Sequence, residues 1–105
     1  MDETYSDDFI KSLGKFLSIK KRIRNKIDQL VQNPLMGEPL RYDLRGLNSV
    51  PVANHFIIIY VYCRMCRNKG DDRILRCHDC DVIADETMRF FDVGPHDAVY
   101  RKLKN

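Results

Sequence analysis

Apolar residues recur every three or four positions through the first third of the chain, which is the spacing of amphipathic helices. One stripe consists of Phe9, Leu13, Phe16 and Leu17, and a second of Ile19, Ile23, Ile27, Leu30 and Val31. Ser6, followed by Asp7 and Asp8, is typical of a helix start, because its hydroxyl can cap the first turn and acids favour the helix dipole. Asn33-Pro34 ends the second helix. The pattern therefore predicts an αα-hairpin with one shared apolar seam.

Strand-like patterns replace the helical period after Gly37. Strands are expected at Leu40–Leu44, Val50–Val52, His55–Tyr62 and Thr87–Val93. The third is almost wholly apolar, as in a central strand, whereas Pro51 places the second at an edge. Gly94-Pro95 ends the last strand, and His96–Leu103 is expected to form a short helix.

The order of these elements predicts an α+β fold in a single domain that spans residues 1–105. The N-terminal αα-hairpin should pack on one face of a small four-stranded antiparallel sheet, with a short C-terminal helix after the last strand. A chain of 105 residues supports one apolar core but not two. In this plan the segment 63–80 is an insert between the last two strands.

All four cysteines lie in that insert, as the two C-x-x-C pairs Cys63, Cys66 and Cys77, Cys80. Each C-x-x-C turn presents two thiolates from one backbone knuckle, and two such pairs can complete a tetrahedral zinc site. The turn sequence Lys69-Gly70-Asp71-Asp72 can reverse the chain between the pairs. The spacing predicts a structural zinc knuckle, with two disulfides or four free thiols as alternatives. Four thiolates would leave no open coordination position, so we expect the chemistry elsewhere and His78 to be exposed.

The net charge of +3 is unevenly distributed. Four acids lie within the first eight residues, so the remainder carries 18 basic against 11 acidic residues. One basic group comprises Lys20, Lys21, Arg22, Arg24 and Lys26, and a second, around the cysteines, comprises Arg64, Arg67, Lys69, Arg73 and Arg76. Both groups can contact phosphates. The alternatives are a solvated helix face for the first group and, for the second, compensation of the negative charge of a four-thiolate zinc centre.

The chain shows no apolar N-terminal run preceded by positive charge, which would mark a signal peptide. Its longest apolar run, Phe56–Cys63, is too short to cross a bilayer. We therefore expect a cytoplasmic protein with no membrane partner and with reduced cysteines.

Three segments carry a resemblance to a known family. They are Pro39-Leu40-Arg41-Tyr42-Asp43-Leu44-Arg45-Gly46-Leu47, Phe56-Ile57-Ile58-Ile59-Tyr60 and Val93-Gly94-Pro95-His96-Asp97-Ala98-Val99-Tyr100. In this order, behind a basic helical hairpin, they resemble the RelE/ParE superfamily of type II toxins over roughly residues 8–101, apart from the insert. The resemblance implies a metal-independent, ribosome-dependent mRNA endonuclease (an mRNA interferase). Its implied partners are the ribosome, mRNA and a RelB-like antitoxin that wraps around the toxin, with a toxin–antitoxin heterotetramer as one form of assembly.

The excess positive charge after residue 8 and the apolar strand His55–Tyr62 suggest where an antitoxin would dock. We expect a small acidic protein whose amphipathic helix packs on an apolar and basic surface, with association accelerated by charge.

Family members differ in their catalytic residues. RelE-like proteins use lysines on the second strand and an arginine that begins the third, where this chain has Val50-Pro51-Val52 and Ile57. The chain is closer to the YafQ-like subset, whose Gly-x-His histidine and terminal aromatic residue correspond to His96 and Tyr100. That subset's acid–aromatic pair at the start of the third strand corresponds to His55-Phe56, so that a histidine replaces the acid.

Metal-free RNA cleavage needs a base, an acid and a cation that stabilises the charged phosphorane. Histidine suits either proton-transfer role, because its unperturbed pKa is about 6.5. The candidates are His96 and His55 for proton transfer, Arg45, Arg89 and Arg101 for phosphate, and Tyr100 for base stacking or hydroxyl donation. The alternatives are that His96 and Asp97 only cap the last helix and that His55 is merely exposed at a strand start.

Two other functions fit parts of the sequence. A ParE-like inhibitor would bind DNA gyrase without hydrolysing anything, which agrees with the missing family cations. A zinc-ribbon nucleic-acid module would make the cysteine insert the functional part, although aromatic residues are not interleaved with its arginines. The histidine in Gly-Pro-His favours an enzyme over a pure binding protein.

Overall fold

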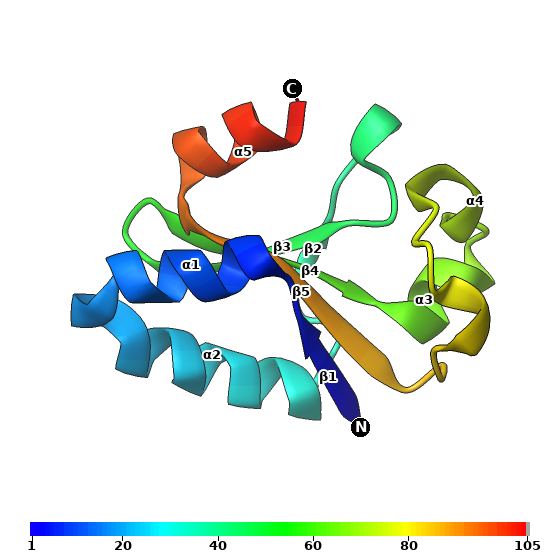
Figure 1. The fold of residues 1–105 in the computed structure, drawn as a ribbon, viewed down its shortest axis with the longest axis horizontal. Coiled ribbons are helices and arrows are strands. Elements are labelled where there is room, and N and C mark those ends of the chain that lie inside the picture. Colours follow the sequence, from blue (N-terminus) through cyan, green and yellow to red (C-terminus); the bar gives the residue numbers. More distant parts are fainter. Residues whose placement is uncertain (105) are drawn as a thin grey trace.

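A computed structural model describes residues 1–104 and shows a mixed β-sheet with helices on both faces (Figure 1). The strands are β1 (Asp2–Tyr5), β2 (Glu38–Pro39), β3 (Asn48–Ala53), β4 (Phe56–Tyr62) and β5 (Thr87–Pro95). The helices are α1 (Asp7–Lys15), α2 (Lys20–Gln32), α3 (Cys63–Asn68), α4 (Asp72–Leu75) and α5 (His96–Lys104). Turns of 3₁₀ helix lie at Leu17–Ile19, Tyr42–Leu44 and Cys80–Val82. None of the helices among residues 1–104 is long and apolar enough to cross a membrane.

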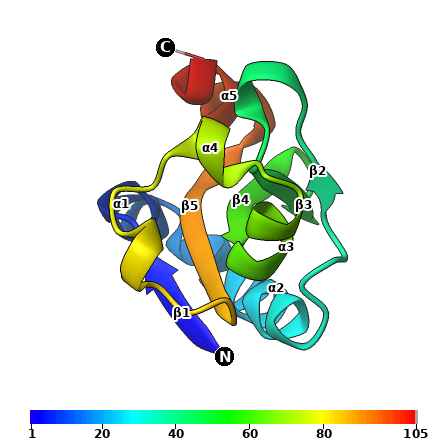
Figure 2. The ribbon, with the colours of Figure 1, turned by 90° about the vertical axis from the view of Figure 1, so that its right-hand side faces the viewer.

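The strands lie in the order β1-β5-β4-β3-β2, so β4 is central. β1 runs parallel to β5, and the other neighbouring strands are antiparallel. The side chains of β4 alternate between two apolar cores. Ile58, Tyr60 and Tyr62 join the core beneath α1 and α2, whereas Ile57, Ile59 and Val61 join the core beneath α5. Figure 1 shows α5 and α2 on opposite sides of the sheet, and Figure 2 looks onto the end that carries α3 and α4.

The predicted α+β class, the αα-hairpin and the three strands around 50–52, 55–62 and 87–93 are confirmed. The prediction of four strands in an antiparallel sheet is wrong, because β1 adds a fifth strand that is parallel to β5. Its sequence, Asp-Glu-Thr-Tyr, shows no apolar alternation. β1 is held by backbone pairing and by Tyr5, whose ring stacks on Phe90 with centroids 5.1 Å apart.

The strand predicted at Leu40–Leu44 is also wrong. Leu40 and Leu44 both pack against the core beneath α5, but the chain between them forms a 3₁₀ turn. Tyr42, at φ 59°, is left-handed there and is 84% exposed. A turn can bring residues four apart to the same side, as a strand does, so apolar alternation alone did not distinguish the two. The short pairing with β3 comes from Glu38–Pro39 instead.

The helical hairpin begins and ends close to the predicted points. The Ser6 hydroxyl accepts a hydrogen bond from the Phe9 amide at 3.1 Å, as a helix N-cap does, and donates to the Phe91 carbonyl at 2.5 Å. α2 ends at Gln32, and Asn33, just before the proline, is its C-cap. Leu17 was expected in the shared seam but is 66% exposed, because α1 already ends at Lys15.

A buried carboxylate on β5 ties both helical layers to the sheet. Asp92 accepts hydrogen bonds from the Ser12 hydroxyl of α1 at 3.0 Å and from the Val93 amide at 2.8 Å. Its other oxygen lies 2.9 Å from Lys102 Nζ of α5, and this pairing raises the pKa of Lys102. Asp92 lies beside a β-bulge, where β5 has one more residue than β4. The network therefore fixes the position of α5, which begins at His96.

Replacing Asp92 by alanine is expected to lower the free energy of unfolding by about 1–3 kcal/mol, because two donors lose their buried acceptor. Lys102→Met should cost about 1 kcal/mol or less, since half of the lysine side chain faces water. Urea unfolding followed by circular dichroism measures both. The control is Asp43→Ala, which changes an exposed acid. Equal stability of the Asp92→Ala and Asp43→Ala proteins would contradict an anchoring role for Asp92.

Candidate functional site

The paired ends of β4 and β5 bring the two candidate histidines together. Phe56 lies opposite Pro95, and one step further the His96 amide donates a hydrogen bond to the His55 carbonyl at 2.6 Å. His55 has φ 64° in the turn that enters β4, and His96 is the first residue of α5. Both residues are exposed. The structure thus places the backbone of His55 next to that of His96.

The His96 ring lies between two neighbours on the first turn of α5. Its Nδ1 is 3.2 Å from Asp97 Oδ1, and its centroid is 4.5 Å from that of Tyr100 in an edge arrangement. A carboxylate only accepts hydrogen bonds, so a hydrogen bond between these atoms needs the proton on Nδ1, which leaves Nε2 of a neutral ring as the acceptor. Such an oriented imidazole can take up or deliver a proton at Nε2.

Tyr100 connects this exposed group to the core. Its side chain is partly buried and packs against the apolar cluster that contains Val99 and the β4 residues Ile57, Ile59 and Val61. Arg101, the next residue, is exposed. α5 therefore presents an imidazole, a phenol and a guanidinium from one short segment whose inner side is fixed by packing.

Arg45 contacts the cysteine insert. Its Nη2 lies 3.3 Å from Oδ1 of Asp71, a residue that is only 8% exposed. Gly46 also touches the insert, because a Cβ added there would lie 3.3 Å from the Leu75 Cβ. The insert therefore supports the loop that carries Arg45. Sequence reasoning did not assign Asp71 this role, since within Gly70-Asp71-Asp72 it looks like an ordinary turn residue.

Arg89 lies away from the histidines. It pairs with Val61 in the sheet, near the end of β4 that leads into the cysteines. At about 3.3 Å per residue, the strand from Arg89 to His96 spans about 23 Å. Arg89 Nη2 lies 2.6 Å from Asp79 Oδ1. Burial disfavours the charge of Arg89, but its hydrogen bond to Asp79 and the neighbouring acids and thiols outweigh that effect and raise its pKa. The structure therefore does not bring Arg89 together with His96.

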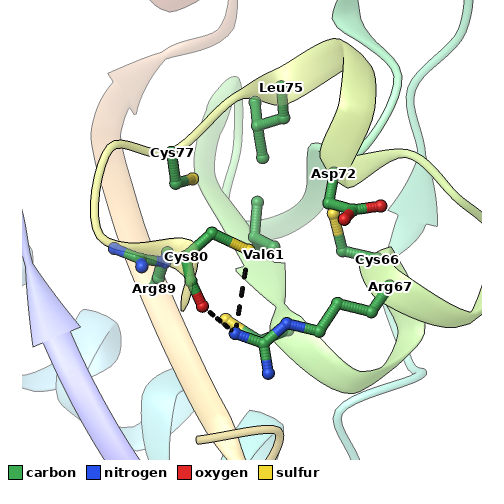
Figure 3. A pocket seen from close by; sticks show the side chains of 9 residues that line it. Val61, Cys66, Arg67, Asp72, Leu75, Cys77, Cys80 and Arg89 are labelled. Carbon is green, nitrogen blue, oxygen red and sulfur yellow. Dashed lines mark hydrogen bonds between the residues drawn. The ribbon is translucent and has the colours of Figure 1, made fainter. Parts of the chain in front are cut away.

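The four cysteines line one small cavity of about 10 Å³ (Figure 3). Its wall is completed by Val61, Arg67, Asp72, Leu75 and Arg89. All four thiols are free, and Cys63 and Cys66 are buried. Within residues 1–104, the structure shows no group of three or more His, Cys, Asp or Glu side chains close enough together to hold a metal ion. His78 is exposed, as predicted.

Burial dominates the acidity of the thiols. It raises the pKa of Cys63 and of Cys77, and together with the nearby charges of Asp71 and Asp72 it raises the pKa of Cys66 to about 12. These three free thiols are therefore uncharged at neutral pH.

Arg67 spans the insert from α3. Its Nη2 donates to the carbonyl oxygens of Cys80, at 2.5 Å, and Ile83, at 2.7 Å, and lies 3.7 Å from Cys80 Sγ. Nη1 forms an ion pair with Asp85. The hydrogen bonds to Asp85 and Cys80 raise the pKa of Arg67. Arg67, from the second basic group, is therefore held mainly by two carbonyls and a carboxylate and lies within reach of one thiol.

The first basic group lies on α2 beside an apolar groove of about 270 Å³. The groove is lined by Tyr5, Ile10, Leu13, Lys20, Ile23, Arg24 and Ile27. Ile10 is 57% exposed, and Lys20 and Arg24 are also exposed. The strand His55–Tyr62, which was expected to contribute a docking surface, is unsuitable because residues 57–62 are buried.

No protein-family model and no curated protein matches the sequence. Solved structures of toxins do match the fold. YafQ from Escherichia coli strain BL21(DE3) has a TM-score of 0.62 at 19% identity, covering 94% of this chain and 97% of that one. The YoeB/ParE toxin from Agrobacterium tumefaciens has a TM-score of 0.66 at 12% identity, covering 91% and 99%. The E. coli DinJ–YafQ complex gives 0.61 at 20% identity, covering 94% and 97%. The chain therefore has the fold of these toxins, as the resemblance to the RelE/ParE superfamily predicts.

A double-mutant cycle tests whether the insert supports the Arg45 loop. Arg45→Ala and Asp71→Ala should each lower the free energy of unfolding, and the double variant should lose less than the sum by about 0.5–1 kcal/mol. Arg24 and Asp28, which are 3.9 Å apart with side chains 78% and 63% exposed, form the control pair. Their coupling energy should be about half as large or less. Strict additivity at Arg45 and Asp71 would show that the two residues do not stabilise each other.

Proposed function

We propose that the protein is the toxin of a type II toxin–antitoxin system and acts as a metal-independent endoribonuclease on mRNA at the ribosome. The observation that carries the proposal is the His96 imidazole, oriented by Asp97 and Tyr100 at the end of the β4–β5 pair. The toxin fold, which extends over 94% of the chain in the comparison with YafQ, supports the same conclusion.

In the proposed reaction the 2′-oxygen of one nucleotide attacks the adjacent phosphorus and the bond to the 5′-oxygen of the next nucleotide breaks. A 2′,3′-cyclic phosphate and a 5′-hydroxyl result. One group removes the 2′-hydroxyl proton and another delivers a proton to the departing 5′-oxygen. His96, through Nε2, is assigned one of these transfers. His55, whose carbonyl oxygen accepts a hydrogen bond from the His96 amide, is the nearest candidate for the other.

The phosphorane formed in between carries additional negative charge, which guanidinium groups stabilise. Arg101 is available for this role because it is exposed on α5, next to Tyr100. Arg45 would contribute from the loop at 40–47 and would have to share its charge with Asp71. Tyr100 is assigned to base stacking, because its ring already contacts the His96 imidazole and is held by the core.

The proposed partner is a small, acidic, RelB-like antitoxin. The YafQ structures include complexes with DinJ. In this chain the groove between α1 and α2 offers an apolar floor with two exposed cations, Lys20 and Arg24. An amphipathic helix with acidic residues beside its apolar face is complementary to that surface. The charge on α2 would accelerate the association and make it sensitive to salt.

Replacing His96 by alanine is expected to reduce mRNA cleavage on translating ribosomes by about 10²–10⁴-fold, because general acid–base catalysis is lost. Primer extension on mRNA in a reconstituted translation system measures the cleavage rate. Tyr100→Phe and Arg45→Ala should each lose less, and His55→Ala reports whether a second histidine takes part. His78→Ala, a change at an exposed histidine of the insert, is the control and should cleave like the wild type.

Two outcomes would contradict this assignment. Cleavage by the His96→Ala protein at the wild-type rate would exclude His96 as a catalytic residue. Absence of cleavage by the folded wild-type protein, together with inhibition of DNA gyrase, would replace the nuclease by a ParE-like inhibitor.

Expression of the protein alone is expected to arrest growth, and co-expression with an adjacent small acidic open reading frame should restore it. In calorimetry Ile10→Glu should weaken the complex at least tenfold, because it places an acid on the floor of the groove. Val82→Glu, which changes a residue that is 83% exposed just after the insert, is the matched control and should bind normally. Unchanged affinity of the Ile10→Glu protein would exclude the groove. Harmless expression without any bound neighbour would exclude the partner.

A further inference from the structure

The structure brings all four cysteines of the insert to one cavity. Cys63 and Cys66 lie on α3, whereas Cys77 follows α4 and Cys80 begins the 3₁₀ turn that precedes β5. The segment between the two pairs reverses direction, with Gly70 at φ 76° and Arg76 at φ 53° in left-handed conformations. All four thiols consequently meet one cavity, and Figure 3 shows Cys66 and Cys77 on different sides of it.

The cavity has the dimensions of a single small occupant. Its volume of about 10 Å³ is close to the space of one water-sized probe. Apart from the cysteines its lining consists of the apolar residues Val61 and Leu75, the two arginines and Asp72. A small cavity with four soft donors suits a thiophilic cation better than an oxygen-preferring ion.

Two arginines converge on the same cavity. Arg67 places Nη2 3.7 Å from Cys80 Sγ, and Arg89 lines the wall with only 12% of its side chain exposed. Asp85 and Asp79 each pair with one of them, but a guanidinium has five N–H donors and a single carboxylate does not use them all. Arg67 Nη2 also donates to the carbonyl oxygens of Cys80 and Ile83, so its contact with Cys80 Sγ is shared with those bonds. The remaining donors of Arg89 can hydrogen-bond to thiolate sulfur.

We propose that Cys63, Cys66, Cys77 and Cys80 bind one zinc ion in a closed structural site, with Arg67 and Arg89 donating hydrogen bonds to its thiolates. Zinc with four thiolates carries a formal charge of −2, which the two guanidinium groups partly offset. Binding requires the four thiols, which already line one cavity, to move closer together, because the described residues 1–104 hold no group of three or more His, Cys, Asp or Glu side chains within reach of one metal ion. Each thiol releases its proton to solvent as its sulfur binds the metal, and no oxidation occurs.

The proposed zinc would stabilise the conformation of the insert. The insert joins the end of β4 to the start of β5, and it also contacts the Arg45 loop through Asp71 and Leu75. A metal at its centre would therefore fix both the strand ends and that loop. The site does not depend on the proposed nuclease activity, because the cysteines lie at the opposite end of β4 from His55 and His96.

The test begins with the full chain, purified under reducing conditions without chelator and supplied with zinc. Metal analysis should give about one zinc per chain. Cobalt exchanged into the protein should give the intense visible absorption and the sulfur-to-cobalt charge-transfer bands of a tetrahedral thiolate centre. Cys66→Ser and Cys80→Ser should abolish the cobalt bands, whereas His78→Ala, which removes the exposed imidazole beside Cys77, should retain them.

A second measurement covers the case in which the serine variants fail to fold. The wild-type thiols should react slowly with a disulfide reagent when zinc is bound, and all four should react at least tenfold faster after a chelator removes it. The melting temperature should fall on the same treatment. Absence of stoichiometric zinc from the folded, reduced protein would overturn the proposal. So would the finding of two disulfides, or an octahedral cobalt spectrum.

Discussion

The antiparallel pairing of β4 with β5 sets the positions of both apolar cores and of both candidate sites. β4 is buried on both faces, because its alternate side chains enter the core beneath α1 and α2 and the core beneath α5. The register of the pair, from Phe56 opposite Pro95 to Tyr62 opposite Met88, then decides what lies at each end. One end brings His55 and His96 together, and the other leads directly into the first pair of cysteines. Strand pairing thus separates the proposed chemistry from the proposed metal.

The insert forms a long connection between β4 and β5. A long loop between two central strands costs conformational entropy unless its own contacts compensate. Here Arg67 fastens α3 to the carbonyls that precede β5, and the Arg64 amide donates to the Asp85 carbonyl at 3.0 Å. The same insert places Asp71 against Arg45. The insert therefore connects the two strands and also supports the Arg45 loop on the face of the sheet that α5 covers.

The parts of the fold that follow from side-chain periodicity could be predicted from the sequence. The helical stripes around Ile23 and Ile27 and the apolar run of β4 are examples, and the closeness of His55 to His96 follows once their strands are taken as antiparallel neighbours. β1 could not be found, because backbone pairing and the stacking of Tyr5 on Phe90 hold it in place of an apolar pattern. Leu40–Leu44 was misassigned because a turn reproduces the same apolar spacing.

Roles that depend on tertiary partners were the least visible in the sequence. Asp92 is one acid in an apolar strand, and only its contacts with Ser12 and Lys102 show that it anchors two helices. The position of Arg89 among the cysteines, by contrast, follows from simple strand length, since it lies near the far end of β5 from His96. A candidate site residue on a paired strand therefore has to be judged by its distance from the strand end where the site lies, as well as by its chemistry.

The two ends of the β4–β5 pair carry the proposed chemistry and the proposed metal site respectively. The most direct test measures the rate of mRNA cleavage per folded molecule while a chelator lowers zinc occupancy stepwise, with the folded fraction followed by circular dichroism. If the metal only shapes the insert, the rate per folded molecule stays constant as zinc is removed and total activity falls only with unfolding. A cleavage rate that falls in proportion to zinc while the protein remains fully folded would contradict the account and place the metal in the reaction.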